Sequence, residues 1–199
     1  MLCNFCPGKT INIKTTSIQY MRTFIAIEMP KKVCGILSAF QDEFRASIKA
    51  SFPKSFHLTL KFLGEVDDKE LESMKNTLQR IRSGSMLLEL DSLGTFPDTS
   101  SPQVLWAGLK GDIDALQKLQ KAVDAATEDI ICLDHKGFVP HLTLARVKKM
   151  TDPTRFKEKL SLPLPAFKFD VWEFVLFKST LTKEGPVYDE LLKIPLRAK

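Results

Sequence analysis

The feature that most constrains this chain is the tetrapeptide His-Leu-Thr-Leu, which occurs twice. One copy begins at His57 and the other at His141, 84 residues further along. The flanking segments repeat in the same order: a strand pattern, a helix pattern, the tetrapeptide strand, a second helix and a further strand. A fixed spacing of whole structural units is typical of an internal duplication. The sequence therefore predicts two related halves.

Hydrophobic periodicity predicts three strands and two helices in the first half. Runs of β-branched and aromatic residues predict strands, and apolar residues three or four positions apart predict helices. Ile48 ends the apolar stripe of the first predicted helix. The predicted elements are a strand at Thr23–Glu28, a helix at Lys31–Ala50, an alternating strand at Phe56–Phe62, a helix at Asp67–Arg82 and a strand at Met86–Asp91.

The second half predicts the same elements again. These are a strand at Val104–Leu109, a helix at Asp112–Asp129, an alternating strand at His141–Val147, a helix at Asp152–Leu160 and strand material at Phe167–Lys178 and Val187–Ile194. Two such units predict an α+β fold of two lobes. Each lobe is an antiparallel sheet with helices on its outer face, and a cleft lies between the lobes. We expect one bilobal domain over residues 21–199.

The first twenty residues differ from the rest of the chain. They contain no acidic residue and no apolar stretch long enough for a signal peptide, and structural periodicity begins at Met21. We expect residues 1–20 to be an extension outside the fold. Three explanations compete: a start codon assigned too far upstream, a cloning remnant, or a flexible tail.

Composition excludes several classes of protein. The chain has 199 residues and a net charge of +5, which suits an anionic ligand, and no apolar run approaches the roughly 20 residues that cross a bilayer. Too few cysteines are present for a disulfide framework, which predicts a reducing compartment, the cytoplasm. The four are Cys3, Cys6, Cys34 and Cys132. The Cys-x-x-Cys pair at the start has no second pair with which to bind a metal.

The two histidines are predicted to face each other. Alternation along a strand directs His57 and Thr59 to one face and the intervening leucines to the core, and His141 and Thr143 repeat this arrangement. A pseudo-two-fold axis between the lobes would bring both imidazoles to one cleft. A lone histidine on a strand is usually structural, whereas two copies at equivalent positions favour a function.

Two imidazoles at one substrate suit general acid–base catalysis, and threonine hydroxyls beside them suit a phosphate. Lys61 lies on the same predicted face as His57, as a further positive charge or as a solvated lysine. Alternation along an ideal strand would place Arg146 on the face opposite His141, so Arg146 reaches the cleft only past a bulge or where the strand ends. No third ligand repeats beside the histidines, and His135 lies in a polar loop, so we expect no metal and no cofactor.

At these residues the sequence resembles a known family. Paired H-x-T-x motifs in a duplicated α+β protein resemble the two-histidine (2H) phosphoesterases, and most closely the RNA 2′,3′-cyclic phosphodiesterases, also called 2′-5′ RNA ligases. The resemblance runs from Met21 to about Val147. The segments that carry it are MRTFIAIEMP, FHLTLKFLGEV, TFPDTSSPQVLWAGL and FVPHLTLARV. Phe56 departs from the small polar residue or leucine that is frequent in the family.

The resemblance implies a role for each matching residue. His57 would be the proton donor to the leaving 3′-oxygen, and His141 would be the proton acceptor that activates water. Three residues would bind the phosphate: Thr59, Thr143 and Arg146. Phe24 would contact the base, although a core phenylalanine is the simpler interpretation.

The resemblance also implies an activity. RNA 2′,3′-cyclic phosphate ends or cyclic nucleotides would be hydrolysed to 2′-phosphomonoesters without metal, with 2′-5′ RNA joining as a minor activity, by a monomer that needs no membrane. Two alternatives stay open, namely a non-catalytic module that binds nucleotides or RNA ends, and a phosphodiesterase for ADP-ribose cyclic phosphate or 2′-5′ oligoadenylate. The loops Pro97–Gln103 and Asp134–Val139 would decide between such substrates.

Overall fold

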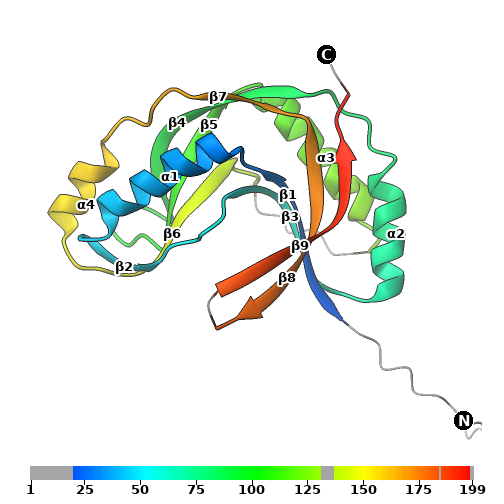
Figure 1. The fold of residues 1–199 in the computed structure, drawn as a ribbon, viewed down its shortest axis with the longest axis horizontal. Helices are drawn as coiled ribbons and strands as arrows, with labels where there is room; N and C mark the ends of the chain where they lie inside the picture. The colour runs from blue at the N-terminus through cyan, green and yellow to red at the C-terminus, as the bar shows by residue number, and fades with distance from the viewer. Residues whose placement is uncertain (1–19, 131–136, 184, 198–199) are drawn as a thin grey trace, which may run out of the picture.

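The computed structural model describes residues 20–130, 137–183 and 185–197, which form four helices and nine strands (Figure 1). Several sequence predictions fall outside these ranges: those for residues 1–19, including Cys3 and Cys6, and those for Cys132 and His135. Cys34, which is described, is a half-buried free thiol. None of the described helices is both long and apolar enough to span a bilayer.

The elements follow the predicted order with some changes of length. They are β1 Met21–Glu28, α1 Lys31–Phe44, β2 Ile48–Ser51, β3 His57–Val66, α2 Asp68–Leu78, β4 Met86–Phe96, β5 Val104–Gly111, α3 Ile113–Thr127, β6 His141–Met150, α4 Pro153–Leu160, β7 Lys168–Val171, β8 Glu173–Thr182 and β9 Gly185–Pro195. The α+β class is therefore confirmed.

Two antiparallel sheets form the lobes. One has the strand order β3-β1-β8-β9 and the other the order β2-β6-β5-β4-β7. Each tetrapeptide strand, β3 or β6, pairs with the first strand of its own half, β1 or β5. Other strands are exchanged between the two halves. β2 and β4, from the first half, join the sheet of β6, while β8 and β9, from the second half, complete the sheet of β3. The two lobes are thus interleaved along the chain.

The helices cover the outer faces of these sheets. In Figure 1, α1 and α4 lie together at one end of the molecule and α2 and α3 at the other. Phe44 of α1 packs edge-on against Phe156 of α4, with ring centroids 5.4 Å apart, and both rings are fully buried. The helices thereby leave the inner faces of the sheets for the cleft.

The first helix is shorter than its apolar spacing predicts. It ends at Phe44, whose carbonyl oxygen accepts hydrogen bonds from both the amide and the hydroxyl of Ser47. Ile48 is buried as expected, but it lies in β2 and not in the helix. An apolar residue such as Ile48 fits the next position of a helical stripe and also the first position of a short buried strand. Periodicity alone therefore predicted a helix that is too long.

Capping residues define the starts of two other helices. Asp67 and Glu70 form a capping box at the start of α2. Asp152 caps α4, accepting a hydrogen bond from the amide of Arg155, and Pro153 occupies the first turn.

Candidate active site

A cleft of about 690 Å³ lies between the two sheets and is lined by all six residues to which the family resemblance gives a role. The polar ones come from the tetrapeptide strands: His57 and Thr59 from β3, and His141, Thr143 and Arg146 from β6. Phe24 of β1 also lines the cleft, as does the β8–β9 hairpin. The duplication has therefore placed equivalent residues of the two halves around one cavity.

A β-bulge interrupts each tetrapeptide strand at the same position. In β3, the pairing with β1 passes from Thr59 to Lys61 and skips Leu60. In β6, the pairing with β5 passes from Thr143 to Ala145 and skips the equivalent leucine. Each bulge shifts the in–out alternation by one residue. The third residue after each threonine therefore lines the cleft, which is how Arg146 reaches it.

The same shift overturns the prediction for Lys61. Its side chain is not on the face of His57 but in the interior, where the residue is 8% exposed and its Nζ lies 3.3 Å from the carboxylate of Asp124 in α3. Strict alternation would put Phe62 on the same face as the core leucines Leu58 and Leu60, but Phe62 is 62% exposed and lines the cleft. A strict period of two fails wherever an extra residue enters the strand.

Aromatic rings and positive charge surround His57. Its ring centroid lies 5.0 Å from that of Phe24 and 5.2 Å from that of Tyr188, which approaches edge-on. Burial lowers the pKa of His57 from 6.5 to about 4, and the charges of Arg146 and His141 contribute to this lowering. The imidazole is therefore neutral at pH 7 in the free protein.

His141 is held in one tautomer by the backbone. Its Nδ1 lies 2.8 Å from the carbonyl oxygen of Val139, which can only accept, so Nδ1 carries the hydrogen and Nε2 keeps its lone pair. The ring of Phe96 packs edge-on at 5.0 Å. Burial lowers the pKa of His141, the hydrogen bond to Val139 opposes this, and the charge of Arg146 adds to the lowering. This imidazole is equipped to accept a proton at Nε2.

Phe24 packs against His57 and has little surface of its own open to the cleft. It is only 4% exposed and packs against the rings of Phe177, Tyr188 and Phe62 as well as His57. The open ring face beside it belongs to Phe62.

Sequence reasoning missed several residues of the cleft. Phe62 could have been found, because it lies 84 residues before Arg146 and so occupies the equivalent position. Tyr188 had no signal, since it lies in the last predicted strand, Val187–Ile194, which has no counterpart in the first half. Arg22 and Lys54 also line the cleft, whereas no aspartate or glutamate is among its described lining residues. The site is thus built for an anion.

The donor set does not resemble a metal centre. Across the described ranges, no three histidine, cysteine, aspartate or glutamate side chains gather closely enough to hold a metal ion. The groups that face the cleft are imidazoles, hydroxyls and cations, which suit the oxygens of a phosphate.

Comparison with known proteins decides the family. The model of the 2′-5′ RNA ligase superfamily matches residues 37–182, most of the chain. The chain belongs to this superfamily. It is 31% identical to a protein of Methanocaldococcus jannaschii over 85% of this chain and 97% of the relative, and 33% identical to one of Thermotoga maritima over 86% and 93%. Both are named RNA 2′,3′-cyclic phosphodiesterase.

Solved structures show the same fold. The crystal structure of TT0787 from Thermus thermophilus matches with a TM-score of 0.76 and 30% identity, covering 90% of this chain and 100% of that one. The superfamily architecture of two lobes therefore accounts for the arrangement of the two sheets and the cleft.

Proposed function

We propose that this protein hydrolyses RNA 2′,3′-cyclic phosphate ends to 2′-phosphomonoesters. The observation that carries the proposal is the pairing of His57 and His141, from equivalent strands, in one cleft lined by cations and hydroxyls. The named activity of its superfamily relatives supports the same reaction. Nothing in this chemistry requires a metal ion, because alignment, a base, an acid and charge stabilisation suffice.

The two histidines take opposite parts in the proposed reaction. Nε2 of His141, left basic by the Val139 hydrogen bond, accepts a proton from water as the water oxygen bonds to phosphorus. The bond from phosphorus to the 3′-oxygen breaks, and His57 donates a proton to that oxygen. The phosphate remains on the 2′-oxygen. Each proton transfer is expected to contribute about 10²–10⁴ in rate.

Thr59, Thr143 and Arg146 are proposed to hold the non-bridging oxygens. The threonines follow the two histidines by two residues on the same strand faces, so their hydroxyls flank the phosphate from opposite lobes. Arg146 supplies positive charge, which is stabilising because negative charge accumulates on these oxygens as the water attacks.

Substrate charge favours protonation of His57. With its pKa lowered to about 4, His57 is neutral in the free protein. An anionic cyclic phosphate in the cleft offsets the positive charge of Arg146 and favours the imidazolium form of His57. Binding and protonation are therefore coupled, because the bound anion shifts His57 toward its protonated form.

The aromatic residues beside His57 are proposed to contact the nucleobase. Phe24 lines the cleft but is only 4% exposed, whereas Phe62 is 62% exposed and offers the larger contact. A 5′-hydroxyl that takes the place of water would give 2′-5′ joining as a minor activity.

The cleft is complete within one chain, so we propose that the protein acts as a monomer. The cytoplasm is the compartment that we propose for it.

The test uses an RNA oligonucleotide that ends in a 2′,3′-cyclic phosphate, incubated with the protein in EDTA. The proposal predicts a 2′-phosphate product, resolved from the 3′-phosphate isomer. A 3′-phosphate product would reverse the assignment of the leaving oxygen. Tight binding without turnover would favour the non-catalytic module, and loss of turnover in EDTA would contradict a metal-free reaction.

A further inference from the structure

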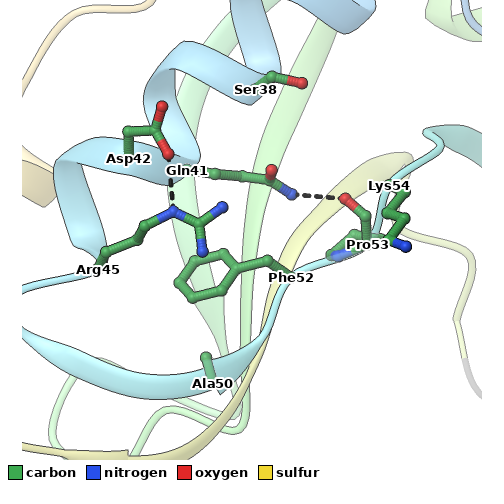
Figure 2. Close-up of a pocket in the computed structure, with 8 residues that line it drawn as sticks. All are labelled: Ser38, Gln41, Asp42, Arg45, Ala50, Phe52, Pro53 and Lys54. Atoms are coloured by element: carbon green, nitrogen blue, oxygen red, sulfur yellow. Dashed lines mark hydrogen bonds and ion pairs between the residues drawn. The ribbon is translucent and has the colours of Figure 1, made fainter. Parts of the chain in front are cut away.

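A buried amide side chain joins the two segments that carry the site residues. Gln41 of α1 is 4% exposed, and its Nε2 donates to the carbonyl oxygens of Leu144 and Pro53, each at 2.9 Å. Figure 2 shows Gln41 reaching from the helix to Pro53. Because both partners can only accept, the amide nitrogen must face them, and both of its hydrogens are used. Gln41 is therefore fixed between two parts of the backbone.

The first part is the bulge in β6. Leu144 is the residue that the pairing with β5 skips, and on the other edge of β6 the pairing with β2 reaches only as far as Arg146. Leu144 thus has no paired residue in either neighbouring strand, and Gln41 supplies the donor for its carbonyl oxygen. The bond holds the backbone between Thr143 and Arg146, where the bulge directs Arg146 into the cleft.

The second part is the segment that leads into the strand of His57. After Ser51, the last residue of β2, the chain separates from β6 and continues to the start of β3. On the way it passes through Phe52 and Pro53, both of which line the cleft. Phe52 packs under the guanidinium group of Arg45, 4.4 Å from its ring centroid. The hydrogen bond from Gln41 to Pro53 ties this segment to α1 as well.

We propose that Gln41 is a positioning residue, which holds the β6 bulge and the segment before His57 against α1 and thereby fixes Arg146 relative to His57. This inference rests on the proposed function. Gln41 is not among the residues that line the cleft, so it acts through the backbone and not by touching substrate. A side chain that only stabilised the fold would leave the cooperation between Arg146 and His57 unchanged.

The test is a double-mutant cycle between Gln41 and Arg146. Gln41→Met keeps the length of the side chain and removes both donors, and we expect kcat to fall about tenfold with a much smaller change in KM. Arg146→Met should lower kcat at least about tenfold in the wild-type protein but by a clearly smaller factor in the Gln41→Met background, because part of the contribution of a misplaced arginine is already lost.

Thr127→Val is the matched control. Thr127 is fully buried in α3 and does not line the cleft, and its hydroxyl donates to the carbonyl oxygen of Val123, so the variant loses a buried hydrogen bond outside the site. In that background, Arg146→Met should keep its full effect on kcat. If Gln41→Met does not fold, Gln41→Asn keeps the amide but is too short for both carbonyl oxygens, and it takes the same place in the cycle.

A second readout requires no turnover. The titration of His57 is followed by NMR, because the charge of Arg146 lowers the pKa of that imidazole. Gln41→Met should raise the pKa of His57 and weaken binding of inorganic phosphate, and Thr127→Val should change neither. An unchanged titration, together with a full Arg146→Met effect in the Gln41→Met background, would overturn the proposal. A wild-type protein without turnover would instead contradict the proposed function, while this second readout still tests Gln41.

Discussion

His57 and His141 begin identical tetrapeptides but have different surroundings. His57 packs against Phe24 and Tyr188, whereas His141 donates from Nδ1 to the carbonyl oxygen of Val139. Burial lowers the pKa of both imidazoles, but only at His141 does a backbone hydrogen bond oppose the lowering. The duplicated sequence therefore supplies two imidazoles in different environments, which is what the two roles of an acid–base pair require.

Arg146 is the charge that links the two histidines. Because it disfavours a second positive charge nearby, Arg146→Met is expected to raise the pKa of His57, measured from the imidazole NMR signals between pH 3 and 8. Arg155→Met serves as the control, since Arg155 is exposed on α4, outside the cleft, and should leave the titration unchanged. A fall in the pKa of His57 in Arg146→Met would mean that the arginine acts through structure and not through charge.

The lowered pKa of His57 also predicts how stability depends on pH. Between its ordinary value of 6.5 and about 4, the unfolded chain binds more protons at this residue than the folded protein does, so folding stability falls as pH falls through this window. The loss attributable to His57 is on the order of 3 kcal/mol. Urea unfolding at pH 7 and pH 4 should show a smaller loss for His57→Asn than for the wild-type protein, and equal losses would contradict the assignment.

At the scale of elements, the two bulges determine what enters the cleft. Each shifts the alternation of its strand after the threonine, so that Phe62 on β3 and Arg146 on β6 occupy equivalent positions. The repeat thus provides an apolar platform from one lobe and a cation from the other. These are the two kinds of group that bind the ends of a single-stranded RNA, since bases stack on aromatic rings and phosphates pair with cations.

The exposed ring of Phe62 gives an element-scale prediction. Phe62→Ala should leave stability nearly unchanged, because the side chain is 62% exposed, but raise KM for a cyclic-phosphate RNA end about tenfold through loss of base stacking. Leu87→Ala removes an exposed apolar side chain from β4 away from the cleft and should leave KM unaltered. Steady-state kinetics and thermal unfolding measure both effects, and an unchanged KM for Phe62→Ala would exclude Phe62 as the platform.

At the scale of the whole molecule, alternation predicted the shared faces of His57 with Thr59 and of His141 with Thr143, and the repeat predicted two lobes. The prediction failed where non-local contacts decide the outcome. Bulges depend on the partner strand, so Lys61 and Phe62 were assigned to the wrong faces. Strand exchange depends on how sheets are completed, which hydrophobic periodicity within a half cannot reveal.

The central claim concerns the whole cleft: residues from two interleaved lobes act on one phosphate. The most direct measurement compares single-turnover rates of wild-type protein, His57→Ala and His141→Ala on a 2′,3′-cyclic-phosphate RNA end, with circular dichroism as the control for folding. We predict that each variant folds and loses at least about 10²-fold in rate. Retention of most of the activity by either folded variant would contradict the account.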